Sequence, residues 1–300
     1  MKLSVVISAF NEEKKVEDAL KSARFADEII FVDNTSSDKT LEIAKKYTQK
    51  VFIRPNNLML NVNKNFGFTK ASGDWIFSLD ADERISNELQ EEIKKEINKK
   101  SSINGYWIPR KNIIFGKWIE HTGWYPDNQL RLFKKAKGRF PEKHVHEMVD
   151  VDGETERLNG HLVHYNYDNI SQFLRKMEIY IESESKDLLA NKYKISAIDS
   201  VRFPLKEFIS RFFAREGFKD GLHGFVLSLL MAFYHLGVFI KLWEKEKFEE
   251  TSSESLTRDL KVEFKSIKKE LRYWIITMFM HQTRNPFKKV GLRLARKFGK

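Results

Sequence analysis

Three carboxylates lie within four positions of one another, directly after a short apolar stretch. Residues 73–79 (GDWIFSL) lead from a turn into mostly apolar residues, which predicts a buried strand, and Asp80, Asp82 and Glu83 follow. If the strand ends there and bends at Ala81, the two aspartates can point at one position, as the oxygen ligands of a hard cation must. A solvated acidic turn is the alternative interpretation. The stretch thus predicts either a divalent-cation site or an exposed turn.

The elements before this stretch alternate between strand and helix. Apolar runs at 3–10, 27–33 and 51–53 predict strands, and helical patterns follow each of them, the first with Asn11 as its N-cap and the last over 64–72. This order predicts an α/β fold with parallel strands, which binds ligands at the carboxyl ends of the strands. Asn11, Asp33 and the Asp80/Asp82 pair all fall at such ends.

The turn after the first strand excludes one class of nucleotide-binding protein. A dinucleotide-binding Rossmann domain needs glycines in this turn, and residues 8–14 contain none. With few glycine amides to hold a phosphate, a divalent cation between a carboxylate and a pyrophosphate would neutralise both charges. We therefore expect Mn²⁺ or Mg²⁺ as the cofactor.

Length, cysteine content and charge narrow the class of protein. The 300 residues exceed one average domain, so we expect a core domain with an appendage. The absence of cysteine excludes disulfides and thiolate metal sites and fits a reducing compartment. The N-terminus shows no signal-peptide pattern, so the catalytic part is expected in the cytoplasm. Residues 201–300 hold 21 Lys+Arg against 11 Asp+Glu, so the last third carries almost all of the net charge of +11.

Several motifs follow one another in order along the chain. They are VVISAFNEE (5–13), VDNTSSDKT (32–40), KNFG (64–67), ASGDWI (71–76), LDADE (79–83), GWYPD (123–127), RLF (131–133), VHE (145–147) and HLVHY (161–165). The motifs up to LDADE resemble family 2 glycosyltransferases of the GT-A fold. Those from GWYPD onward are similar to the bacterial subgroup that includes lipopolysaccharide-core β-1,4-glucosyltransferases, and the resemblance covers residues 1 to 245.

The resemblance implies roles for the polar residues at the strand ends. In this family the carboxylate after the second strand binds the uracil or ribose, which assigns Asp33 to the nucleotide, with Asn11 and Glu12 beside it. Asp80 and Asp82 match the Asp-x-Asp motif, with Asp82 as the direct metal ligand and Asp80 nearer the ribose. One or two carboxylates together with substrate phosphates are the usual ligands of Mg²⁺.

Two further residues are candidates on the donor side. Lys64 stands where the family often has a basic residue that approaches the diphosphate; an exposed helical lysine is the alternative. Related enzymes often complete the metal ligands with a histidine, and we expect His164 in this role. His144, His146 and His161 lie in the same region of the sequence.

Transfer to a hydroxyl needs a base to accept its proton, and two carboxylates are candidates. Glu147 stands where the family commonly has the base, although many members have an acidic pair there. Asp127 follows Trp124 and Tyr125, an aromatic pair suited to a sugar face in the acceptor site, and Asp127 could orient the acceptor instead. We favour Glu147 as the base. Both aromatic side chains could equally belong to the core.

The rest of the chain is predicted to be helical. Residues 169–243 form a helical extension that contains the apolar run 225–243, close to the roughly 20 residues of a membrane span. Because Gly221, Gly224 and Gly237 interrupt this region, we expect an interfacial or membrane-dipping helix; a span and a buried helix of a soluble domain are the alternatives.

Charge and serine content divide the C-terminal part. Residues 244–255 read as a linker, and 256–300 as basic amphipathic helices that favour an anionic membrane surface. We do not expect this basic part to bind nucleic acid, because its basic residues alternate with large apolar ones and the sequence shows no nucleic-acid-binding module.

These observations together predict a GT-A catalytic domain over 1–168, with a mixed sheet flanked by helices, and a C-terminal membrane-associating region. The predicted activity is metal-dependent, inverting transfer from a nucleotide sugar, UDP-linked, to a lipid-linked glycan of the cell envelope or lipopolysaccharide. The protein is expected at the cytoplasmic face of the cell membrane, as a peripheral or monotopic protein. Its oligomeric state stays open, with a homo-oligomer as one alternative. A polyprenyl-phosphate sugar synthase and a non-catalytic membrane-bound scaffold are the alternatives.

Overall fold

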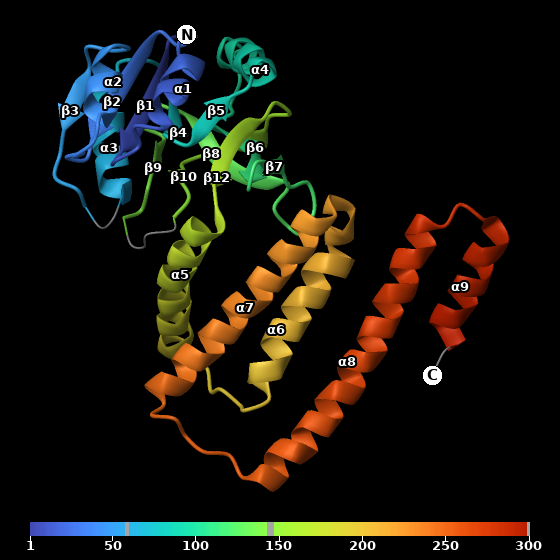
Figure 1. Ribbon diagram of the computed structural model, residues 1–300. Helices are drawn as coiled ribbons and strands as arrows, with labels where there is room; N and C mark the ends of the chain where they lie inside the picture. The colour runs from blue at the N-terminus through green and yellow to red at the C-terminus, as the bar shows by residue number, and fades with distance from the viewer. Residues whose placement is uncertain (58–59, 143–146, 299–300) are drawn as a thin grey trace. The chain divides into compact units, whose positions relative to one another are not determined.

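The computed structural model describes residues 1–57, 60–142 and 147–298 (Figure 1). The chain divides into two compact units. Unit 1 consists of Met1–Ile114 and Tyr125–Asn166, and unit 2 of Phe115–Trp124 and Tyr167–Lys300. His144 and His146 lie outside the described residues.

Unit 1 is built on a mixed sheet with the strand order β3-β2-β1-β4-β8-β6-β12-β5. The first four strands are parallel, whereas β8 pairs antiparallel with both β4 and β6. The strands are β1 (Leu3–Ala9), β2 (Glu28–Asp33), β3 (Val51–Ile53), β4 (Trp75–Asp80), β5 (Glu83–Ile85), β6 (Gly105–Ile114), β8 (Asp127–Lys134) and β12 (Leu162–Tyr167). The mixed sheet of the predicted GT-A fold is thus confirmed.

Both faces of the sheet are covered, because side chains alternate along each strand. On one face Val5 and Ile7 pack in a cluster with α1 (Val16–Ser22) and α4 (Asn87–Ile97). On the other face Val6 packs with Phe68 of α3 (Leu60–Lys70). α2 (Thr40–Lys45) follows β2 along the chain. Parallel strands buried on both faces read as unbroken apolar runs, which is why β1, β2 and β4 were predictable.

A glycine in α3 sets how closely this helix approaches the sheet. A Cβ on Gly67 would lie 2.5 Å from Val6 Cγ1 and 3.1 Å from Val32 Cγ2. Any larger residue would push the helix away from β1 and β2. Lys64 lies one turn earlier on the same helix, so its position relative to the strand ends depends on this contact.

Two predicted helix starts were wrong. Asn11 is not an N-cap: its φ is 55°, and α1 begins only at Val16. The Asn11 side chain accepts from Ser37 N–H at 2.8 Å instead, so the residue connects two loops. α3 begins at Leu60 rather than at Lys64, which puts Lys64 inside the helix.

Unit 2 is mainly helical (Figure 1). α7 packs against α5 and α6, and α8 contacts α6 and α9. Among the described residues α7 is the one helix long and apolar enough to cross a membrane, judged by length and composition. The helices are α5 (Ile170–Ala190), α6 (Asp199–Ile209), α7 (Leu222–Lys245), α8 (Ser253–Gln282) and α9 (Pro286–Phe298).

Candidate active site

Asp33, the last residue of β2, is a buried carboxylate with an unused oxygen. Its side chain is 1% exposed, and Oδ2 accepts from Ser36 N–H at 3.0 Å. Oδ1 is buried and has no hydrogen-bond partner among the described residues. A buried acceptor without a donor is costly, so this oxygen is available for a donor group of a ligand.

Two loops meet beside Asp33. The Asn11 N–H donates to Ser36 Oγ at 3.0 Å, and the Glu12 N–H donates to Thr40 Oγ1 at 2.8 Å. These bonds connect the loop after β1 to the loop after β2 and to the first residue of α2. The structure thus brings Asn11, Glu12 and Asp33 together at the carboxyl ends of β1 and β2.

Asp80, at the end of β4, lies between two cations. Lys64 Nζ is 2.5 Å from Asp80 Oδ1, and the Arg131 guanidinium bonds to Oδ2. Burial alone would raise the pKa of Asp80, but Arg131 and Lys64 hold it well below its usual range. Asp80 is therefore ionised, and Lys64 lies beside the Asp-x-Asp motif.

The ion pairs continue beyond Asp80 into the sheet. Arg131 also bonds to Glu83, whose side chain is 0% exposed, at 2.7 Å, and Arg110 reaches the same Glu83 oxygen at 3.1 Å. Arg110 then contacts Asp127 Oδ2 through NH2 at 2.6 Å and Nε at 2.9 Å. We call Lys64, Asp80, Arg131, Glu83, Arg110 and Asp127 the ion chain. Charges alternate along it, so each buried charge is compensated.

Asp127 is saturated with donors. Besides Arg110, Asn112 Nδ2 donates to Asp127 Oδ2 at 3.1 Å and Gln129 Nε2 to Oδ1 at 2.8 Å. Burial raises the pKa of Asp127, but Arg110 and these hydrogen bonds give a net lowering.

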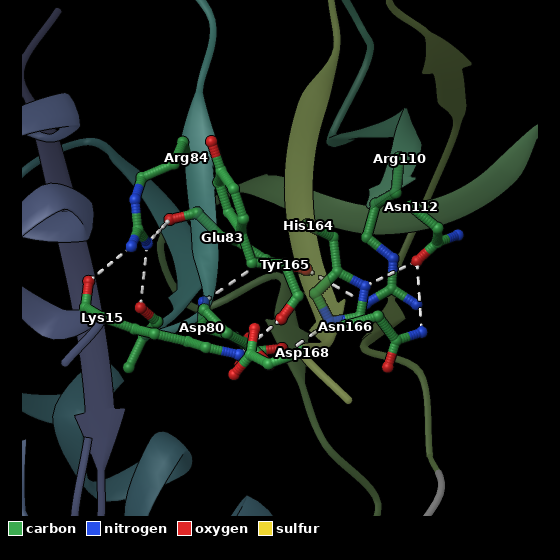
Figure 2. Close-up of polar contacts among 12 residues, drawn as sticks. Lys15, Asp80, Glu83, Arg84, Arg110, Asn112, His164, Tyr165, Asn166 and Asp168 are labelled. Carbon is green, nitrogen blue, oxygen red and sulfur yellow. Dashed lines mark hydrogen bonds and ion pairs between the residues drawn. The ribbon is translucent and has the colours of Figure 1, made fainter. Parts of the chain in front are cut away.

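Asp82 lies beside His164. His164 Nε2 is 3.4 Å from Asp82 Oδ2, and the Tyr165 N–H donates to the Asp82 carbonyl at 2.9 Å. On its other side, His164 Nδ1 lies 2.7 Å from Asn112 Oδ1 (Figure 2). His164 is 7% exposed and Asn112 is 0% exposed. The structure thus brings together two of the predicted metal ligands, from β12 and from the turn after β4.

Arg84 fixes the turn between Asp80 and Asp82. Its guanidinium donates to the Ala81 carbonyl at 2.9 Å and to the Lys15 carbonyl at 2.6 Å (Figure 2). The Lys15 ammonium in turn donates to the Tyr165 carbonyl at 2.7 Å. On either side of Ala81 the two carboxylates contact different partners, Asp80 the ion chain and Asp82 the His164 imidazole.

The Asp82–His164 pair fits a divalent cation. No group of three His, Asp or Glu side chains placed for a metal occurs within residues 1–57, 60–142 and 147–298. A carboxylate and an imidazole whose other nitrogen is hydrogen-bonded nevertheless fit a divalent transition-metal cation such as Mn²⁺ as part of its ligand set, with phosphate oxygens and water as the rest.

The candidate base Glu147 lies near α3. Glu147 Oε2 accepts from Asn61 Nδ2 at 3.3 Å and from the Glu142 N–H at 2.7 Å. The preceding residues of its motif lie outside the described part of the chain.

The two aromatic candidates belong to different units. Tyr125, in unit 1, stacks on His161 with its hydroxyl 2.9 Å from Nε2. Trp124, in unit 2, contacts the ring of Tyr167 and lies under the Arg211 guanidinium at 5.8 Å.

Sequence reasoning missed the roles of Glu83, Arg110, Asn112 and Arg131. Arg131 stands between Leu130 and Leu132 in β8, and Arg110 follows the apolar start of β6, and this was the available signal. A charged residue inside a buried strand must have a partner. Asn112 carried no comparable signal.

Known proteins similar to this chain identify its family. The family described as Glycosyl transferase family 2 matches residues 4–151. The chain is 32% identical to an uncharacterized glycosyltransferase of Rickettsia typhi, over 81% of this chain and 87% of that protein. It is 24% identical to the lipopolysaccharide core biosynthesis glycosyltransferase LpsC of Rhizobium meliloti, over 81% of this chain and 92% of LpsC.

A solved structure is also similar. The crystal structure of S. aureus TarS 1–349 in complex with UDP-GlcNAc has a TM-score of 0.41 and 16% identity, over 79% of this chain and 82% of that one. The identity to the Rickettsia protein extends over most of both chains, well beyond the matched family region. The chain belongs to the family 2 glycosyltransferases and is an enzyme of the GT-A fold.

Proposed function

We propose that this glycosyltransferase moves a sugar, with inversion, from a UDP-linked donor to a sugar hydroxyl of a lipid-anchored glycan, and that it requires Mn²⁺ or Mg²⁺. The observation that carries the proposal is the Asp82–His164 pair at 3.4 Å, next to the ionised Asp80. The similarity to LpsC supports an acceptor of the cell envelope.

The nucleotide would bind at the ends of β1 and β2. The free Oδ1 of Asp33 can accept from an N–H of the base or from a ribose hydroxyl. Asn11 and Glu12 line the same region through the loop contacts described above. Asp80, held by Arg131, would lie toward the ribose.

Asp82 and His164 would hold the divalent cation together with oxygens of the donor diphosphate. The cation supplies electrostatic stabilisation of the departing diphosphate. Lys64 contacts Asp80 and would add a second positive charge on the diphosphate side.

Glu147 would be the base that accepts the proton of the acceptor hydroxyl. Asp127, the other candidate, is bound by a guanidinium and two amides, and its pKa is lowered. A lowered pKa makes a carboxylate a weaker base, which argues against Asp127 in this role. Asp127 would instead orient groups near the acceptor.

Membrane association is proposed for unit 2 from two exposed apolar stripes. Along α7 the side chains of Leu222, Leu229 and Phe233 lie at helical spacing and are exposed, while other side chains of the helix pack on α5 and α6. Such a stripe fits a lipid phase.

The second stripe lies on α9. Phe287, Val290 and Leu294 are exposed at helical spacing, and Phe287 is 86% exposed. Five basic residues surround them, and an amphipathic helix of this kind binds anionic lipid. These are Lys288, Lys289, Arg293, Arg296 and Lys297. This supports a place for the enzyme on an anionic membrane surface.

The test is sugar transfer from a panel of nucleotide sugars to a lipid-linked glycan extract, with wild type, Glu147→Gln and Asp127→Asn. We expect one donor to be used, loss of at least 10²-fold in kcat for Glu147→Gln, and a smaller loss for Asp127→Asn. Transfer to polyprenyl phosphate that is insensitive to Glu147→Gln would favour the synthase alternative. UDP binding without transfer to any acceptor would favour the scaffold.

A further inference from the structure

Asn112 lies between the Asp82–His164 pair and Asp127. It is on β6 and is 0% exposed. Its side chain contacts Asp127 Oδ2 through Nδ2 at 3.1 Å and His164 Nδ1 through Oδ1 at 2.7 Å. One buried amide therefore touches both the candidate metal pair and the end of the ion chain.

The chemistry of these contacts fixes which atom carries which proton. Asp127 is paired with Arg110, so its carboxylate is ionised and can only accept. The amide NH₂ of Asn112 must therefore face Asp127, and its carbonyl oxygen must face His164. An oxygen at that position requires a proton on His164 Nδ1, which in the neutral ring leaves the lone pair on Nε2, the atom 3.4 Å from Asp82 Oδ2.

We propose that Asn112 is a positioning residue that holds His164 in the Nδ1–H tautomer, so that Nε2 and the Asp82 carboxylate are both available to one divalent cation. The inference rests on the proposed function in that the cation is the one required for transfer. Arg110 contributes indirectly: it pairs with Asp127, and the Asp127 carboxylate orients the Asn112 amide.

The first test reads the tautomer of the neutral ring directly, in metal-free protein at alkaline pH, by ¹⁵N–¹H NMR of histidine-labelled enzyme, with the His164 signal assigned from His164→Gln. Wild type should show the Nδ1–H tautomer. Asn112→Leu removes the acceptor and should shift the ring toward Nε2–H. An Nε2–H ring in wild type would overturn the proposal, even if Asn112→Leu failed to fold.

The second test is the Kd of Mn²⁺ alone, measured by electron paramagnetic resonance. Asn112→Leu should weaken binding by about 10- to 100-fold, while UDP binding without metal stays within about twofold of wild type. Asn104→Leu is the matched control, because the Asn104 amide donates to the Asp152 carbonyl, away from the site. An unchanged Mn²⁺ Kd in folded Asn112→Leu would refute the positioning role.

The two proposals fail in different ways. If wild type binds Mn²⁺ with the predicted tautomer but transfers no sugar to any acceptor, the proposed function falls and the role of Asn112 stands. If transfer depends on Mn²⁺ but neither the His164 tautomer nor the Mn²⁺ Kd responds to Asn112→Leu, the proposed function stands and the positioning role of Asn112 falls.

Discussion

Arg131→Met should strongly destabilise unit 1, because it removes the central cation of the ion chain. Arg131 is 5% exposed and bonds to both Asp80 and Glu83. The substitution leaves Glu83, with a side chain that is 0% exposed, to the longer contact with Arg110 at 3.1 Å. Removing one partner from a buried pair costs about 3–5 kcal/mol, because the other charge stays buried and unpaired.

The assay is thermal and urea unfolding followed by circular dichroism. For a unit of this size, about 3–5 kcal/mol corresponds to a fall in Tm of about 10 °C. Arg139→Met, at an exposed arginine of β9 (Gly138–Arg139), is the matched control and should change Tm by no more than about 2 °C.

A second variant separates charge from packing. Adding Glu83→Gln to Arg131→Met removes the excess negative charge that the loss of Arg131 leaves in the ion chain, so we expect the double variant to regain about half of the lost stability. The reasoning is refuted if Arg131→Met lowers the free energy of unfolding by less than about 1 kcal/mol, as the exposed control does.

Three further predictions follow from buried or exposed charges. The pKa of Glu28 is lowered to about 2, because hydrogen bonds from Lys50, Ser4 and Ser72 outweigh burial, which raises it. The folded-state pKa lies below the ordinary 4.5, so Glu28 contributes about 3 kcal/mol of stability above pH 4.5, which is lost as the pH falls toward 2. The stability gap between wild type and Glu28→Gln in urea unfolding should shrink from pH 7 to pH 3; a constant gap contradicts this. Asp33→Ala should weaken UDP binding about 10- to 100-fold in calorimetry, since a hydrogen bond to a charged group is lost; an unchanged Kd would remove Asp33 from the nucleotide site. Serine in place of Lys288, Lys289 and Arg293 should weaken flotation with anionic vesicles by about 10²-fold in low salt, and equal binding to neutral vesicles by wild type would argue against charge recognition.

The sequence predicted the parallel half of the sheet because its strands are continuous apolar runs that end in polar residues. β4 and Asp80 are an example. The antiparallel half, β8 and β6, was not assigned, since these strands contain Arg131 and Arg110 and pair over long distances in the chain. Local pattern carries no information about such pairings.

The site was predictable to a similar extent. Strand ends located Asp33 and Asp80, and the family resemblance, not spacing, pointed to His164. The hydrogen bonds of Asn112 come from β6, β8 and β12 meeting in space, which no local pattern specifies. The roles of Glu147, Asp127, Trp124 and Tyr125 stay predictions, as do the domain boundaries.

The most direct measurement of the central claim is release of nucleoside diphosphate from UDP-sugars with and without Mn²⁺, comparing wild type, Asp82→Ala and Asp152→Ala. Asp152 is the control, because its side chain is 79% exposed and pairs only with the surface residue Lys137 among its described contacts. The account predicts metal-dependent turnover by wild type and Asp152→Ala, and loss of about 10²-fold or more in folded Asp82→Ala. Turnover that is equal without a divalent cation, or equal in Asp82→Ala, would contradict it.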